Sequence, residues 1–314
     1  MDVTREALTR LVGPVGELAD AARLEGGMFA ETWSVTLADG RRVVVKIAPS
    51  DSDRLLSHEH DLLRTEAMVY ELAQHHAGLL MPRPLHVDVS REVVPGDVLV
   101  ATFLAGTPWE SVGFGAHDED ARTARAEADL AALLGRLGAV TGETFGYPQS
   151  PALRGPTWRG AFTAMVEALL ADAVRWDVAV PADRFRAALT QHGTTLDEVR
   201  VPRLVHTDLW PGNLFVDAAT GALVGVIDPE RALWGDPLLE LVGADPMHTG
   251  LWRRLAPAGV DEPSARVRLA LYRAWLALVM IVEVAPRTYT GDWLTDYDAA
   301  NRTRLDEALT ELGT

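Results

Sequence analysis

The stretch that most constrains the fold is residues 206–230, which read HTDLWPGNLFVDAATGALVGVIDPE. Asp208 is followed by Leu-Trp-Pro-Gly, a run that cannot continue a helix, so Asp208 and Asn213 belong to one loop. Two short apolar runs between 214 and 227 are separated by Ala-Ala-Thr-Gly, which predicts a β-hairpin. Asp228 ends the second strand, so the hairpin returns its carboxylate toward the loop.

The order Asp, Asn, Asp suits phosphoryl transfer from a nucleotide. A carboxylate at Asp208 can orient an acceptor hydroxyl and take its proton, as a catalytic base does. Asn213 and Asp228 offer oxygen atoms, which are the ligands that Mg²⁺ prefers beside nucleotide phosphates. His206 is expected to support the loop by hydrogen bonding, because a neighbouring carboxylate already fits the role of base.

Lys46 is the second constraint, because it is the only lysine among the 29 basic residues of the chain. It ends the apolar run Val-Val-Val, which predicts a strand. Lysine presents a compact point charge that can reach phosphate oxygens, and arginine does not replace it there. Such a lysine is held by a glutamate on the following helix. Glu59 and Glu66 both qualify, and we favour Glu66 because it lies in the middle of that helix.

The first third of the chain has the pattern of a sheet with one helix. Residues 31–37 and 41–47 are rich in β-formers and flank an Asp-Gly turn, which is a strong hairpin signal. Leucines and other apolar residues between 53 and 76 recur at helical spacing. Two further strands are predicted at 85–89 and 98–104.

After Gly106 the chain changes to mainly helical patterns, broken by short β-like pieces. This shift predicts an α+β protein with an N-terminal lobe at 1–105, an antiparallel sheet plus a helix, and a larger, mainly helical lobe at 106–314. The helices are expected at 118–140, 158–176, 182–190, 262–285 and 292–312, and the strands at 203–206, 214–216 and 223–227.

Composition restricts the partners and the compartment. The net charge of −16 disfavours nucleic acid and is compatible with a cationic substrate. The chain has no cysteine, and its N-terminus lacks a signal-peptide pattern. No apolar run is expected to reach the roughly 18 residues of a membrane span. We therefore predict a cytoplasmic protein, as a monomer or homodimer, without a membrane partner.

Further residues are predicted to contact the nucleotide and the acceptor. Gly26 and Gly27 could cover phosphates with backbone N–H groups, and the backbone of Thr102, Phe103 and Leu104 could bind adenine. Acidic and aromatic residues of the helical lobe are the candidates for the acceptor site: Glu230, Trp234, Glu283, Tyr289, Trp293 and Asp296.

These motifs resemble the aminoglycoside phosphotransferase and choline kinase group, which has a bilobal protein-kinase-like fold. The resemblance covers roughly 24–106 and 203–245. It implies ATP, or GTP, and Mg²⁺ as cofactors, Asp208 as base, Asn213 and Asp228 as metal ligands, Lys46 with Glu66 at the phosphates, and Asp236 as an organiser of the C-terminal lobe. Thr207 stands where glycine is usual, which is tolerable if its backbone angles are ordinary.

The leading hypothesis is therefore an ATP-dependent kinase of a small-molecule hydroxyl. The acceptor would be an aminoglycoside-like antibiotic, with a role in antibiotic resistance, an amino sugar or another polar natural product. Trp210 is similar to fructosamine kinases, so a fructosamine or other sugar kinase is the alternative. A protein kinase is disfavoured because only seven residues separate Asp228 from Asp236. A non-catalytic nucleotide-binding pseudokinase is the remaining alternative.

Overall fold

A computed structural model describes residues 3–24, 29–76 and 78–314. They form two compact units, neither of which is continuous in sequence. The first unit comprises Met1–Ser52, Asp61–Ala126 and Pro211–Glu230, and the second comprises Asp53–His60, Glu127–Trp210 and Arg231–Thr314. Relative to the expected lobes, the first unit gains 106–126 and the hairpin segment, and the second gains 53–60.

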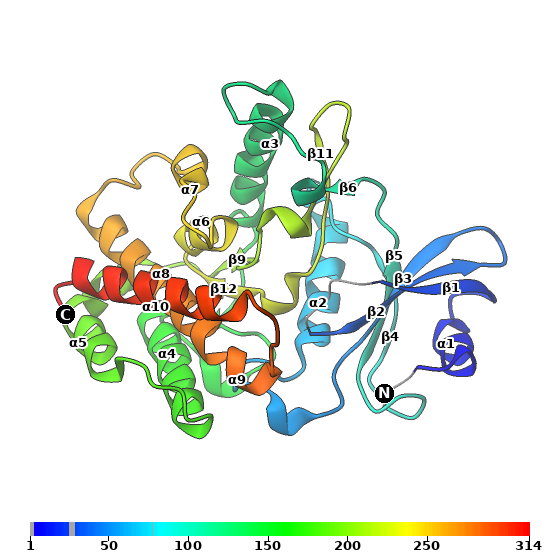
Figure 1. The fold of residues 1–314 in the computed structure, drawn as a ribbon, viewed down its shortest axis with the longest axis horizontal. Helices are drawn as coiled ribbons and strands as arrows, with labels where there is room; N and C mark the ends of the chain where they lie inside the picture. Colours follow the sequence, from blue (N-terminus) through cyan, green and yellow to red (C-terminus); the bar gives the residue numbers. More distant parts are fainter. Residues whose placement is uncertain (1–2, 25–28, 77) are drawn as a thin grey trace. The chain divides into compact units, whose positions relative to one another are not determined.

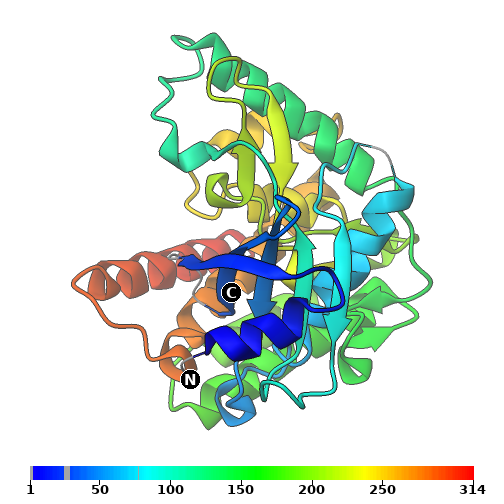
Figure 2. The ribbon, with the colours of Figure 1, turned by 90° about the vertical axis from the view of Figure 1, so that its right-hand side faces the viewer.

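The first unit contains a five-stranded antiparallel sheet in the order β1-β2-β3-β5-β4. Its two faces follow from the alternation of side chains along each strand. On β5, Val98 and Val100 pack in the cluster that includes α1, whereas Leu99 and Ala101 pack against α2. Figure 1 shows the two helices on either side of the sheet, and in Figure 2 α1 lies in front of the sheet. The elements are α1 (Arg5–Val12), β1 (Leu18–Leu24), β2 (Glu31–Leu37), β3 (Arg42–Ile47), α2 (Leu62–His75), β4 (Pro84–Asp88) and β5 (Val98–Thr102).

Sequence patterns did not predict α1 and β1. The helix has only eight residues, and its start is fixed by Thr4, whose side chain accepts a hydrogen bond from the Ala7 N–H. The strand reads LADAARL and is largely exposed, so it lacks both β-branched residues and alternating burial. Pairing with β2 forms this strand, and no local signal indicates it.

The helix expected at 53–76 begins later, at Leu62. Its first residue is preceded by Asp61, which has a left-handed φ of 57°, so the helix does not extend further back. Only a short 3₁₀ turn, Ser52–Arg54, lies in the preceding segment. His58 and Glu59 are buried by contacts in the second unit, and these tertiary contacts override the apolar spacing.

The predicted hairpin is confirmed. Strands β10 (Leu214–Val216) and β11 (Leu223–Val226) pair antiparallel, and β6 (Thr107–Pro108) adds a third strand. In the turn, the Asp217 carboxylate accepts the N–H groups of Ala219 and Thr220 at 3.0 and 2.8 Å. The hairpin and the residues that follow β11 up to Glu230 thus belong to the same unit as the five-stranded sheet.

The second unit is mainly helical around a small sheet ordered β8-β7-β12-β9. Its core helix is α8, and α10 packs alongside it (Figure 1). Trp158, Phe162 and Tyr272 form a buried aromatic group between α4 and α8. The elements are α3 (Ala121–Leu137, which begins in the first unit), β7 (Phe145–Gly146), β8 (Arg154–Gly155), α4 (Trp158–Arg175), α5 (Ala182–His192), β9 (Arg203–Val205), β12 (Leu233–Gly235), α6 (Leu238–Ala244), α7 (Leu251–Leu255), α8 (Pro263–Val282), α9 (Val284–Arg287) and α10 (Leu294–Glu311).

One helical stretch, Pro263–Arg287, is long and apolar enough to cross a membrane by length and composition. The expectation that no segment reaches this length was wrong, because the charged residues that flank the apolar run are themselves helical. Within the protein, 72% of its most apolar window is buried, as is usual for the core helix of a soluble protein.

Candidate active site

Lys46 lies on β3 and points to the α2 side of the sheet. Its neighbours Val45 and Ile47 belong to the cluster on the α1 side, so strand alternation turns Lys46 the other way. The Nζ atom lies 2.8 Å from Glu66 Oε2 and 2.6 Å from Asp228 Oδ1. Lys46 therefore pairs with Glu66, the glutamate that we favoured, and it also binds the carboxylate that follows β11.

Tyr70 also contacts the group formed by Lys46, Glu66 and Asp228, and this role was not predicted. It lies four residues after Glu66 on α2, hence on the same helix face, and its hydroxyl hydrogen-bonds the Glu66 carboxylate. The same hydroxyl accepts the backbone N–H of Asp228 at 3.3 Å. The i, i+4 spacing of Glu66 and Tyr70 could have indicated this contact. A tyrosine on the buried face of a helix, however, is usually interpreted as a core residue.

The electrostatic surroundings favour the charged form of the Lys46 ammonium. Burial alone would lower the pKa of Lys46, but Asp228 and Glu66 raise it well above its ordinary value. Burial raises the pKa of Glu66, and Lys46 opposes that shift. Because the Lys46 side chain is 13% exposed and its ammonium faces two carboxylates, a negative ligand would find a fixed positive charge at this point.

A cluster of three carboxylates that could bind a cation lies beside Lys46. Oxygen atoms of Glu66, Asp228 and Glu230 all lie within 4.8 Å of one another. Glu230, which we expected at the acceptor, thus lies beside Glu66 and Asp228 and is buried. Asn213 is buried in the same unit, and its backbone carbonyl accepts the Ile227 N–H at 3.1 Å. These oxygen donors fit the chemistry of Mg²⁺.

The loop that carries Asp208 lies in the second unit and is held by α6. The Glu240 carboxylate accepts the backbone N–H groups of His206 and Thr207 at 2.7 and 2.8 Å. His206 Nδ1 accepts the Asp208 N–H at 3.3 Å, so His206 supports the loop as expected. Glu240 was not predicted, because nothing in the local sequence indicates which main-chain groups a helix residue will contact.

Thr207 does not have the ordinary backbone angles that would make it a simple replacement for glycine. Its φ is 70°, in the left-handed region that a β-branched residue rarely adopts. Its hydroxyl donates to the Arg231 carbonyl at 3.1 Å, which contributes to holding this conformation. A Cβ on Gly243 of α6 would lie 2.4 Å from the Thr207 carbonyl oxygen, so only glycine permits this approach of helix and loop.

We expect the stability of the Glu240→Gln variant to depend less on pH than that of the wild type. Burial raises the pKa of Glu240 from 4.5 to about 7. The stability linked to this group is therefore present below about pH 4.5 and is lost as the pH rises through about 7. Urea unfolding should show the wild type losing on the order of 2 kcal/mol relative to the variant between pH 5 and 8.

The matched control for that measurement is Glu143→Gln, which changes an exposed glutamate of the same unit. Its difference from the wild type should stay constant over the same pH range. A Glu240→Gln difference that also stays constant would show that the carboxylate does not titrate with the folded state.

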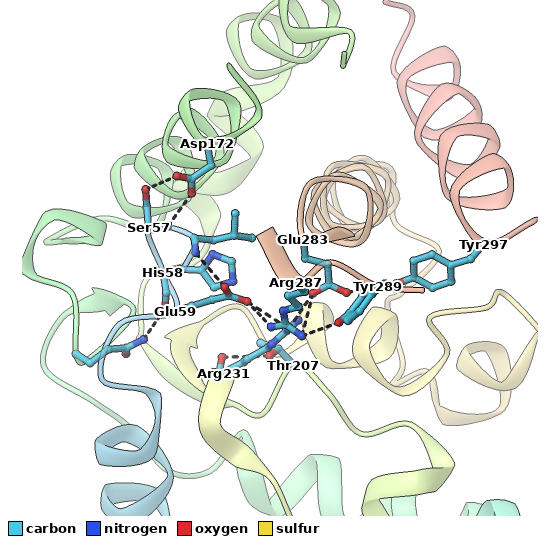
Figure 3. A network of polar contacts seen from close by, with 12 residues as sticks. Ser57, His58, Glu59, Asp172, Thr207, Arg231, Glu283, Arg287, Tyr289 and Tyr297 are labelled. Atoms are coloured by element: carbon cyan, nitrogen blue, oxygen red, sulfur yellow. Dashed lines mark hydrogen bonds and ion pairs between the residues drawn. The ribbon is translucent and has the colours of Figure 1, made fainter. Parts of the chain in front are cut away.

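The second unit also contains a buried network of two arginines and two glutamates (Figure 3). Glu283 lies 2.9 Å from Arg231 and 3.6 Å from Arg287, and Glu59 contacts both arginines. Burial would raise the pKa of Glu59, but Arg287 and other cationic groups lower it to about 2. Glu59 therefore serves this network and is not the partner of Lys46. Glu283, which we expected at the acceptor, is 4% exposed and neutralised by arginines.

An aromatic group borders this network. The Trp293 ring lies 5.8 Å from Tyr289 and 5.3 Å from Tyr297, centroid to centroid. The Tyr297 hydroxyl donates to Glu283 at 3.3 Å, and Arg287 donates to the Tyr289 hydroxyl at 2.9 Å. Trp293 itself is 44% exposed.

The remaining acceptor candidates are separate from this aromatic group or solvent-exposed. Asp296, in the first turn of α10, is exposed. The Trp234 ring, on β12, packs against Gly142, where an added Cβ would lie only 2.5 Å away.

The expected adenine segment lies at the end of β5. The N–H groups of Thr102 and Phe103 donate to the carbonyls of Arg83 and Arg42 at 2.9 and 3.3 Å. These two donors are therefore used within the sheet. The Leu104 side chain lies against Gly225 of β11. Gly26 and Gly27 lie outside the described residues, so their predicted role stays a prediction.

The sequence comparison identifies the class of protein as a phosphotransferase. A sequence model of the phosphotransferase enzyme family matches residues 20–302, and the chain belongs to that family. The predicted family, fold class and enzyme class are thereby confirmed.

Solved structures with the same fold are similar over nearly the whole chain. Aminoglycoside phosphotransferase APH(4)-Ia is 18% identical, with a TM-score of 0.66, and the match covers 99% of this chain and 100% of that one. A candidate fructosamine-3-kinase from Thermobifida fusca is 20% identical, with a TM-score of 0.66 and coverage of 96% and 98%. A variant of APH(4)-Ia in complex with AMP-PNP and hygromycin B is 18% identical, with a TM-score of 0.64 and coverage of 97% and 98%.

Proposed function

We propose that this protein transfers the γ-phosphate of ATP to a hydroxyl group of a cationic small molecule. The observation that carries the proposal is the arrangement of Lys46, whose ammonium is held by Glu66 and lies 2.6 Å from Asp228. Phosphoryl transfer depends on fixed charges that position and neutralise phosphate oxygens, and this group supplies them. The cofactor is ATP, or GTP, with Mg²⁺.

On the nucleotide side, Lys46 binds the α- and β-phosphates while Glu66 and Tyr70 fix its direction. Asn213 and Asp228 hold the metal, with Glu230 as a further carboxylate in reach of the same oxygen cluster. The bound ion supplies positive charge that neutralises the phosphate oxygens. The structure supports this assignment because the carboxylates are close together and one of them already faces a cation.

On the acceptor side, Asp208 orients the hydroxyl and takes its proton as the bond to phosphorus forms. The Glu240 carboxylate fixes the two residues before Asp208, so the loop has little freedom to move the base. No covalent intermediate on the enzyme is needed, because positioning and charge stabilisation account for the reaction.

We place the acceptor against the exposed Trp293, with Tyr289 beside it and Asp296 in the next turn. An indole face and a carboxylate bind aminated rings by stacking, cation–π attraction and ion pairing. An aminoglycoside-like antibiotic or amino sugar is therefore the acceptor class, and a resistance role follows if the acceptor is an antibiotic. A fructosamine is the second candidate, because Trp210 is similar to that group and a candidate fructosamine kinase has this fold.

A screen of ADP release tests this proposal. Aminoglycosides, amino sugars, fructosyl-amines, nucleosides and peptide antibiotics are compared with neutral sugars in buffer of low ionic strength, where charge steering is strongest. We expect aminated acceptors to be turned over at least tenfold faster than the neutral ones. Equal turnover of neutral and aminated sugars would contradict the cationic class. Nucleotide binding without transfer to any acceptor would favour a pseudokinase.

A further inference from the structure

A basic pocket lies in the second unit, formed by α7, the following loop, α8 and the end of α10. Its volume is about 430 Å³, within the range of sites for small molecules. Arg266, Leu269 and Arg273 of α8 line it, at spacings that put them on one helix face. Arg253 of α7 adds a third guanidinium group. None of these residues has a role in the proposed phosphotransfer.

The Trp252 ring organises two of the guanidinium groups. The Arg273 guanidinium carbon lies 4.7 Å from the ring centroid, and that of Arg253 lies 5.1 Å from it. Cation–π attraction at these distances holds flexible arginine side chains in place. The pocket therefore presents positive groups whose positions are fixed in part before any ligand binds, which reduces the entropic cost of binding.

The positive charge of the pocket is incompletely neutralised. Three arginines line it against two carboxylates, Asp261 and Glu311. Arg273 meets Glu311 at 3.7 Å, beyond hydrogen-bond distance, and that glutamate side chain is 48% exposed. Within residues 3–24, 29–76 and 78–314, no carboxylate lies within 4.0 Å of the Arg253 or Arg266 guanidinium.

Burial of the central arginine strengthens the case for an anion. The Arg273 side chain is only 17% exposed, and burial lowers its pKa; Glu311 and Asp245 act in the opposite direction, and Arg253 adds to the lowering. A guanidinium in these surroundings gains from an additional negative partner. In a chain with a net charge of −16, such a concentration of cations is unlike the average surface.

We infer that this pocket binds a small-molecule oxyanion, a phosphate ester or a polycarboxylate, at a site separate from the kinase residues. Guanidinium groups match both anions because their N–H pairs fit two oxygen atoms at once. Arg266 and Arg273 would contact the anionic group, and Leu269 would contact the organic part of the ligand.

Calorimetric titration of the full-length chain tests this inference. Inorganic phosphate and citrate are titrated separately, with NaCl adjusted to keep the ionic strength constant, so that the two anion classes are distinguished. We expect saturable binding of at least one probe, weakened about tenfold or more by Arg266→Gln and by Arg273→Gln. Arg253→Gln changes another exposed residue of the pocket and should weaken binding as well, without a change in the thermal unfolding of the protein.

The matched control is Arg200→Gln, which removes an exposed arginine outside the pocket and should leave binding unchanged. ADP release by the pocket variants should equal that of the wild type, so this result is independent of the proposed kinase reaction. Absence of saturable binding, or equal binding by the wild type, the pocket variants and the control, would overturn the inference.

Discussion

The Asp208→Ala variant is expected to turn over its acceptor roughly three orders of magnitude more slowly than the wild type, because general-base catalysis contributes on that scale. Nucleotide affinity should change little, since Lys46, Glu66 and Asp228 are untouched. Steady-state ADP release gives the turnover number, and equilibrium binding of a non-hydrolysable ATP analogue gives the affinity. A fall in turnover with unchanged nucleotide affinity would assign Asp208 to the chemical step.

Two controls make that result specific. Glu143→Ala removes an exposed carboxylate of the same unit and should keep wild-type turnover. Thermal unfolding should show that Asp208→Ala folds normally, because Glu240 binds main-chain groups that the substitution leaves in place. Wild-type turnover in Asp208→Ala would remove this residue from the role of base.

Asp228→Asn is expected to weaken magnesium-dependent nucleotide binding and to lower turnover by about a hundredfold, the cost of losing one stabilising charge in an active site. Asparagine is the appropriate replacement because Asp228 has a left-handed φ of 68°, which asparagine tolerates. Its amide keeps the shape of the carboxylate but removes the charge that faces Lys46 and that would face the proposed metal ion. Nucleotide binding measured over a series of Mg²⁺ concentrations reports the effect.

The control for this variant is Asp217→Asn, in the hairpin turn of the same unit. An asparagine oxygen can still accept the turn N–H groups that Asp217 accepts, so the magnesium dependence should match the wild type. If Asp228→Asn also titrates with magnesium as the wild type does, Asp228 is not a metal ligand.

Much of the fold was predictable because strong local patterns coincide with the elements. The Asp-Gly turn predicted the hairpin of β2 and β3, and the Ala-Ala-Thr-Gly turn predicted the hairpin of β10 and β11. The elements that were missed, such as β1 and the two-residue strands, form through pairing with distant partners, and their own residues carry little preference.

The candidate site was predictable where function depends on residue type and spacing, and less so where it depends on packing. The Lys46–Glu66 pair followed from a lone lysine and a mid-helix glutamate. The surroundings of Glu283 and Glu230 were not predictable, because sequence cannot distinguish an acid at a ligand site from one neutralised by arginines or gathered with other carboxylates. Their role at the acceptor stays a prediction. Glu240 was missed for a related reason, since its partners are backbone groups far along the chain.

The single lysine has a practical consequence for spectroscopy. Because no other side chain of this protein has an ε-amine, isotope labelling of lysine alone gives one ammonium signal, and that signal reports the environment between Glu66 and Asp228. Its raised pKa keeps this amine protonated and therefore slow to react with acylating reagents at neutral pH. Any ligand that separates the ammonium from its carboxylates would be visible at a single resonance.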